Sequence, residues 1–179
     1  MDFYNAFKQQ NYSYMKERLS EGYNPDDVYF TSRNRDSYVT FLAAQKDNNP
    51  KIDDFCELLE AFLNHGANIE HTSSNGYFPV FVAESIKIAT ILEKHGADFT
   101  RIHHDPIFNS SQVPEFYINN PKILDIAFSQ GVLPTCRIAT VVWDDGSRAE
   151  KAERRAIYNK WFMFNFGKNK EDLCDDWDI

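Results

Sequence analysis

The chain has 179 residues, of which 42% are hydrophobic and 15% aromatic, and its formal net charge is −8 at pH 7. This length predicts one folded domain with a substantial core, or a short array of repeats, and the apolar content excludes a disordered chain. The negative charge disfavours binding to nucleic acid or to an anionic membrane and favours a basic protein partner.

The cysteines and the N-terminal segment place the chain among intracellular proteins. Cys56, Cys136 and Cys174 are an odd number and lack the C-x-x-C spacing of zinc sites, so we expect free thiols in a reducing compartment. The N-terminal segment is polar, and no stretch approaches the roughly 18 apolar residues that span a bilayer. These features predict a soluble, cytoplasmic protein that folds without a cofactor or a metal.

Four segments share one pattern, in which an apolar stripe at helical spacing ends at a glycine. Their sequences are RLSEGYNPD, FLNHGANIE, LEKHGADFT and AFSQGVLPT, starting at residues 18, 62, 92 and 127. Because glycine adopts positive φ without strain, each can end a helix. The expected helix ends lie at Gly22, Gly66, Gly96 and Gly131, at intervals of 44, 30 and 35 residues (66 − 22, 96 − 66, 131 − 96).

Prolines predict additional short helices in front of two of these long ones. Pro79 and Pro106 occur in similar x-Pro-[Val/Ile]-Phe segments and suit the first turn of a helix, where no amide donor is lost. Repetition at this period predicts a stack of helix pairs. The stretch between Gly22 and Gly66 carries an insertion, with loops expected at 31–37 and 46–54.

The region after residue 135 does not show the repeated pattern of an apolar stripe that ends at a glycine. The apolar run 136–143 leaves a strand and a buried helix open, because periodicity cannot decide at that length. Residues 147–166 predict a long helix with Ser147 or Asp145 as its N-cap, and 167–179 form an acidic tail. The expected packing face of the long helix consists of Ala149, Ala152, Ala156, Trp161 and Phe164.

The turns NHGANIE and KHGADFT, with the segments FPVF and DPIF, resemble the ankyrin-repeat family over roughly residues 2–135. The resemblance implies an all-α solenoid of about four helix-pair units. It would comprise repeats at 1–135, a C-terminal cap with the long helix at 136–166 and the tail at 167–179, all in one structural domain. Phe81 and Phe108 replace the histidine of the family's T-P-L-H segment, so we expect aromatic packing there.

Ankyrin arrays bind other macromolecules, mostly proteins, and rarely catalyse, so the resemblance implies a protein-binding module without catalytic activity. The turn tips of the stack would form one row. The tail is either a disordered end or an anchor for a basic partner. The expected partner-binding residues are Arg33, Arg35, Tyr77, Arg101, His103 and His104 at the tips, and Asp175, Asp176 and Trp177 in the tail.

Catalytic motifs are missing: the sequence has no Gly-rich phosphate loop, no G-x-S-x-G and no H-E-x-x-H. The five histidines lie near the repeated turns, and His103, His104 and Asp105 leave a metal-using enzyme open as an alternative. We expect instead that His65 and His95 occupy equivalent helix ends, and that the pair at 103 and 104 lies at an exposed loop tip. The basic residues of 147–166 are a weak indication of nucleic-acid binding.

Size and charge favour one kind of binding module. A small acidic protein can cover a basic target quickly and selectively. The chain is similar in size and charge to ankyrin-type immunity proteins that neutralise bacterial toxins, and to phage- or virus-encoded antagonists of a host defence protein. We therefore expect an inhibitor or immunity-type antagonist of a basic protein partner, with a general scaffold or adaptor subunit as the alternative.

Overall fold

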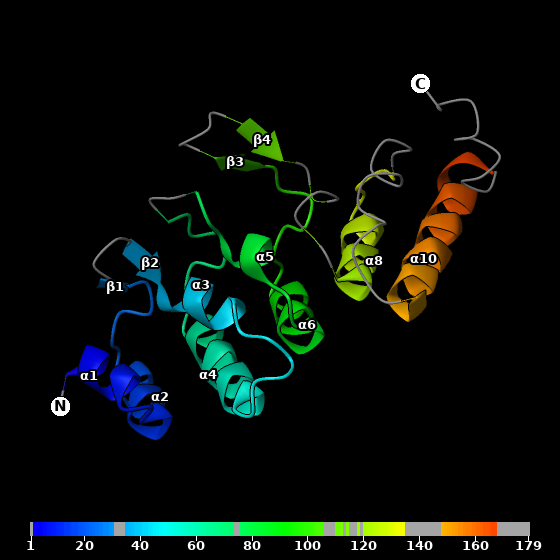
Figure 1. Cartoon of the computed structure of the whole chain (residues 1–179). Helices are drawn as coiled ribbons and strands as arrows, with labels where there is room; N and C mark the ends of the chain where they lie inside the picture. Colours follow the sequence, from blue (N-terminus) through cyan, green and yellow to red (C-terminus); the bar gives the residue numbers. More distant parts are fainter. Residues whose placement is uncertain are drawn as a thin grey trace. The chain divides into compact units, whose positions relative to one another are not determined.

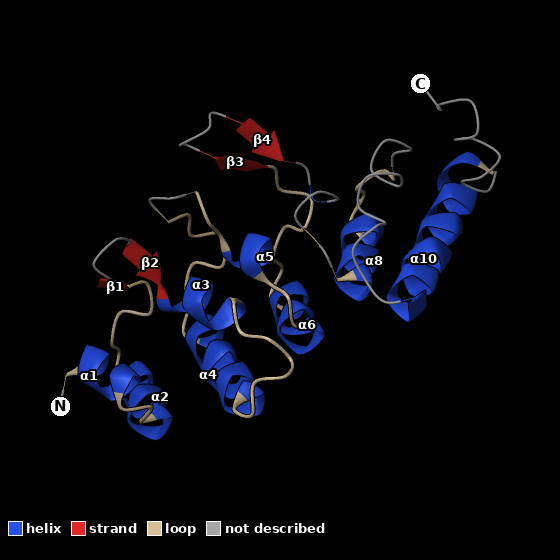
Figure 2. Ribbon diagram, in the orientation of Figure 1, coloured by secondary structure: helices blue, strands red, loops and turns tan. Residues whose placement is uncertain are grey.

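The computed structural model describes residues 2–30, 35–73, 76–105, 110–112, 114, 118, 120–134 and 148–167. These residues are predominantly helical, as predicted, and include four strands of three residues each (Figure 2). The chain forms two compact units, which are Met1–Asp98 with His103–Ser111 (unit 1) and Phe99–Ile102 with Gln112–Ile179 (unit 2). The division lies upstream of residue 135, and the predicted single domain stays a prediction.

Unit 1 contains three helix pairs (Figure 1). The pairs are α1 (Phe3–Lys8) with α2 (Tyr12–Ser20), α3 (Tyr38–Ala43) with α4 (Ile52–Asn64), and α5 (Pro79–Val82) with α6 (Ile86–Lys94). α2 packs against α4 and α4 against α6, while α3 packs against α5. The second helices therefore form one layer, and α3 and α5 stack beside it. Pro79 begins α5, as predicted.

Two small sheets accompany the helices. β1 (Val28–Phe30) pairs antiparallel with β2 (Arg35–Ser37), and β3 (His103–Asp105) pairs with β4 (Ser110–Gln112). β2 leads directly into α3, whose N-cap Ser37 accepts a hydrogen bond from Thr40 N at 3.0 Å. No strand was predicted in these four segments, because three residues are too few to show an alternating pattern.

The predicted glycine ends are confirmed. Gly22, Gly66, Gly96 and Gly131 have φ of 91°, 85°, 82° and 106°. In each case the residue after the glycine donates its N–H to the carbonyl five residues earlier, as Ala67 does to Phe62 at 3.1 Å. This is the Schellman arrangement, which satisfies carbonyls at a helix end. His65 and His95 are the residues just before their glycines, at equivalent positions as predicted.

α1 ends in the same arrangement without a glycine. Gln10 has φ of 57°, while Asn11 N donates to Ala6 O at 2.9 Å and Gln10 N to Phe7 O at 3.0 Å. A side chain in this conformation costs about 1 kcal/mol. The Gln10 amide oxygen accepts a hydrogen bond from Lys51 Nζ, so this residue connects the end of α1 to the start of α4.

An aromatic cluster joins the first two helix pairs. The Phe62 ring stacks on Tyr38 at 5.5 Å and meets Phe3 edge-on at 5.9 Å. Phe3 in turn lies parallel to Tyr23 with ring centroids 3.9 Å apart. Burial, with a hydrogen bond to Asp27, raises the pKa of the Tyr23 hydroxyl, so this group stays protonated. The cluster therefore packs as a set of neutral rings.

Two exposed ion pairs show the register of α6 against α4. Lys87 Nζ lies 2.8 Å from Asp53 and Lys94 Nζ lies 2.8 Å from Glu60. Both partners advance by seven residues (94 − 87 = 60 − 53 = 7), so the two helices run in the same direction. All four side chains are exposed, so each pair contributes little to stability. Their value here is geometric, since they show that α6 lies parallel to α4 in a fixed register.

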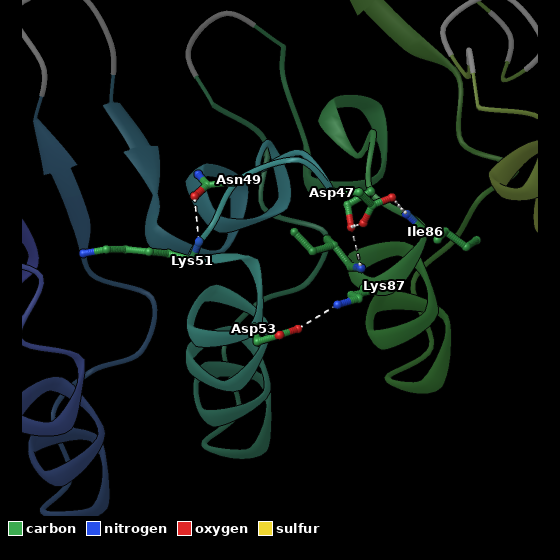
Figure 3. Close-up of polar contacts among 8 residues, drawn as sticks. Asp47, Asn49, Lys51, Asp53, Ile86 and Lys87 are labelled. Carbon is green, nitrogen blue, oxygen red and sulfur yellow. Dashed lines mark hydrogen bonds and ion pairs between the residues drawn. The ribbon is translucent and has the colours of Figure 1, made fainter.

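The loop before α4 holds the start of α6 (Figure 3). The Asp47 carboxylate accepts hydrogen bonds from the Ser85 hydroxyl and from Ile86 N, the latter at 3.2 Å. Ser85 is fully buried and is itself the N-cap of α6, accepting from Ile88 N at 3.3 Å. The predicted loop 46–54 is therefore a structural contact, and its last three residues already belong to α4.

In unit 2, α8 (Pro121–Ser129) packs against α10 (Arg148–Phe166). Asp125 accepts hydrogen bonds from Lys160 Nζ at 2.7 Å and from Trp161 Nε1 at 2.5 Å. Burial acts to raise the pKa of Asp125, but these two donors and the Lys160 charge outweigh it and hold the pKa below its ordinary value. This carboxylate links α8 to α10 through hydrogen bonds.

The long helix is confirmed, but the predicted packing face is wrong for every member except Trp161. The three alanines are exposed and Phe164 is 78% exposed, whereas Tyr158 and Phe162 are buried and Trp161 is half-buried. Alanine occurs on buried and on exposed helix faces alike, so the spacing of the alanines could not identify the buried face. Phe128 of α8 meets Tyr158 edge-on at 5.3 Å, which sets the buried side.

Some predictions lie outside the described residues. These are the short helix at Pro106, the aromatic role of Phe108, the run 136–143, the caps Asp145 and Ser147, and the acidic tail beyond Gly167.

The helix ends can be tested by substitutions that change only the backbone preference. A Cβ at Gly96 would meet no atom within 4 Å, so Gly96→Ala should lower the free energy of unfolding by about 1 kcal/mol through φ alone. Conversely, Gln10→Gly should be more stable than Gln10→Ala by about 1 kcal/mol, because both remove the amide and only glycine relieves the strain. Chemical denaturation measures both differences. Equal stability of the two Gln10 variants would contradict the strained conformation.

The α8–α10 contact should depend on pH. Asp125→Asn should destabilise the protein by about 1 kcal/mol near pH 7, since hydrogen bonds to a charged acceptor are lost. Because the folded pKa of Asp125 lies below the ordinary value of 3.8, this stability is present above pH 3.8 and is lost as the pH falls through the folded value. Thermal melts of the two proteins should converge at low pH. Glu153→Gln, whose exposed partner Lys122 lies 3.8 Å away, is the matched control and should change little.

Candidate functional site

A tight turn before α5 presents Tyr77 at the surface of unit 1. Ser73 is buried, its hydroxyl accepts from Tyr77 N at 3.1 Å, and its own N donates to Tyr77 O at 2.7 Å. Gly76 completes the turn with φ of 80°. Two hydrogen bonds therefore hold the backbone of Tyr77, while 40% of the residue stays exposed.

Four aromatic residues, Tyr77, Phe78, Phe81 and His103, gather at this turn, and we call them the aromatic tip cluster. The Phe81 ring stacks on His103 at 3.7 Å and on Tyr77 at 5.3 Å. Phe78 lies beneath, with its ring centroid 5.8 Å from that of Phe81. Phe81 is thus packed among rings, as predicted, and Tyr77 forms the exposed part of the cluster.

His103 corrects one prediction. It lies in β3 and is only 1% exposed, not at an exposed loop tip. Its Nδ1 lies 3.2 Å from Gly76 O, and because a carbonyl only accepts, Nδ1 carries the proton. The surrounding sequence is polar and typical of a loop, whereas the ring and the acceptor that bury His103 come from residues more than twenty positions earlier.

The other expected partner-binding residues are placed only in part. Arg35 lies in β2 and His104 in β3, and Arg101 is half-buried in the segment before β3. The structure brings together Tyr77 and His103, whose ring centroids are 6.0 Å apart. Outside the described residues lie Arg33, Asp175, Asp176 and Trp177, and the side chains of Arg35 and His104.

A contact between successive turns was missed by the sequence analysis. Asp26 Oδ1 accepts from Asn68 N at 2.5 Å, and Glu70 Oε1 accepts from Asp98 N at 2.9 Å. In both, the acceptor stands four residues after its glycine (26 − 22 = 70 − 66 = 4) and the donor two after the next (68 − 66 = 98 − 96 = 2). We call this pair the turn ladder. The acidic residue at the fourth position was the signal that could have predicted it.

An aromatic pocket of about 260 Å³ was also missed. It is lined by Tyr4, Phe7, Lys8, Gln10, Tyr12, Phe41 and Phe55. These residues come from α1 and the turn after it, from α3 and from the starts of α2 and α4, so no local pattern joins them. Within it Phe7 meets Phe41 edge-on at 4.8 Å, and Tyr12 lies 5.6 Å from Phe55.

The described residues do not bring three or more histidine, cysteine, aspartate or glutamate side chains together in a metal-holding group. No helix in the described ranges combines the length and apolar character needed to cross a bilayer. Cys56 is half-buried, and burial followed by the charge of Asp53 raises the pKa of its thiol, which disfavours the reactive thiolate.

Comparisons of the chain with protein-family models, with curated proteins and with solved structures found no match.

Substitutions of His103 and Tyr77 should distinguish a residue that stabilises the aromatic tip cluster from one that is available to a partner. His103→Ala removes a buried ring and leaves Gly76 O without this donor, so it should lower the free energy of unfolding by about 2 kcal/mol. Tyr77→Ala removes a ring of a residue that is 40% exposed, so it should cost less than His103→Ala, about 1 kcal/mol. Denaturation curves of the two variants measure the contrast. A small cost for His103→Ala would contradict its burial between Phe81 and Gly76.

Proposed function

We propose that this protein is a non-catalytic, protein-binding module of the ankyrin type. It acts in the cytoplasm as an inhibitor or immunity-type antagonist of a basic protein. The observation that carries the proposal is repetition of the same contacts in successive turns. Helix pairs that end in the same Schellman arrangement, and a turn ladder with the same spacing twice, support a stack of translated units.

The aromatic tip cluster supports a binding role for the turns. Tyrosine supplies a large contact area at a small cost in conformational entropy, and aromatic residues are frequent among those that dominate binding energy. Tyr77 has this character, because its backbone is held by Ser73 and its ring rests on Phe81. A rigid, exposed ring of this kind loses little freedom when a partner covers it.

Charge supports a basic partner. The net charge of −8 raises the rate of encounter with a positively charged protein and disfavours acidic ones. A stack of repeats offers an extended surface to such a partner, and inhibition would follow from covering the partner's own functional site.

The test begins with affinity capture from the native host at low and physiological salt, followed by measurement with the purified partner. We expect one basic protein at near-equal stoichiometry, loss of that protein's activity in the complex, and binding that weakens steeply as salt rises. Tyr77→Ala should weaken binding by roughly tenfold, as expected for a central aromatic contact.

Tyr4→Ala is the matched control, because Tyr4 is 37% exposed and lies in the aromatic pocket rather than at the turns. It should bind the basic partner as the native protein does. A complex that is insensitive to salt would contradict the electrostatic part of the proposal, and a partner whose activity is unchanged would indicate an adaptor.

A further inference from the structure

The aromatic pocket has the size of a site for one side chain. An engineered cavity of about 150 Å³ accommodates benzene, and sites for drug-sized ligands begin near 300 Å³. The observed volume of about 260 Å³ lies between these values. Its walls are mainly aromatic, so it suits one large apolar side chain that a partner inserts from the surface.

Lys8 lines this pocket, and the ammonium group of Lys51 contacts Gln10, another lining residue. Lys8 Nζ lies 4.3 Å from the centroid of the Tyr4 ring, and Lys51 Nζ donates to the Gln10 amide oxygen. Within the described part of the chain, neither Lys8 nor Lys51 forms a salt bridge. Both cations contact neutral groups, so their charge stays available to an incoming anion.

Other lysines of the same chain behave differently. Six of them lie within 4.0 Å of a carboxylate: Lys16, Lys46, Lys87, Lys94, Lys122 and Lys160. In a protein with 27 acidic residues against 19 lysines and arginines, carboxylates are abundant. These six lysines are paired with carboxylates. The ammonium groups of Lys8 and Lys51, which contact neutral groups beside one aromatic pocket, are therefore a specific feature of this surface.

Gln10 supplies a second observation at the same place. It keeps a strained positive φ where α2, α4, α6 and α8 end at glycine, and such strain is often found at ligand sites. Its side chain lines the pocket and positions Lys51. Asp54 is close enough to Tyr12 to raise the pKa of that hydroxyl, second to burial. Lys8 and Lys51 are the groups near the pocket that favour an anion.

We propose that the aromatic pocket is a separate docking site for an acidic peptide segment of a partner protein. One large apolar side chain of that segment enters among the rings, and the adjacent aspartate or glutamate side chains contact Lys8 and Lys51. The inference depends only on unit 1 and does not require the proposed recognition of a basic protein by the turns.

Fluorescence anisotropy with a labelled synthetic peptide, in which one phenylalanine is flanked by aspartates, tests this site. The intact protein should bind it, and affinity should fall as the salt concentration rises. Replacing phenylalanine by alanine, or aspartates by lysines, should each abolish detectable binding. The double variant Lys8→Ala/Lys51→Ala should raise Kd by roughly tenfold, since two charge-assisted contacts are lost.

Matched variants distinguish the site from general charge. Tyr4→Ala should also weaken peptide binding, whereas Tyr77→Ala and the pair-breaking Lys94→Ala should leave it unchanged. Thermal melts establish that each variant is folded. No binding at about millimolar peptide, equal binding of the lysine-containing peptide, or an unaffected double variant would overturn the proposal.

Discussion

Unit 1 depends on burial against α4, because its other helices are too short to be stable alone. α1 and α3 have six residues each and α5 has four, whereas isolated helices below about 12 residues are marginal even in favourable sequences. α4 has 13 residues, and its side chains Leu58, Leu59 and Phe62 are completely buried. α2, α3 and α6 all pack on α4, so we expect these helices to form only as α4 becomes buried.

The features that could be predicted from sequence are those with a local cause. Gly66 ends α4 because only its own φ and two nearby hydrogen bonds are involved, and Pro79 begins α5 for a similar reason. The buried side of α10 has a distant cause, namely Phe128 of α8. His103 likewise owes its burial to Phe81 and to the carbonyl of Gly76. Single-chain patterns do not contain these pairings, so both predictions were wrong.

The two candidate surfaces share no residue. The aromatic tip cluster precedes and begins α5, where Tyr77 leads into Pro79. The aromatic pocket lies where α1 and α3 end, at Gln10 and Phe41. The two surfaces also differ in the charge of the partner that they favour. Tyr77 lies on an acidic protein, which favours a basic partner, whereas the ammonium groups of Lys8 and Lys51 beside the aromatic pocket favour an acidic one. Together the two proposals make unit 1 a module that holds two unlike segments.

The turn ladder has a direction. The acceptor always belongs to the earlier turn and the donor to the later one, as with Asp26 and Asn68 and again with Glu70 and Asp98. During synthesis the N-terminal part of a chain emerges first and can begin to fold first. Each completed turn then already carries the carboxylate that the next turn needs. In both contacts the acceptor side chain is therefore synthesised before the amide that donates to it.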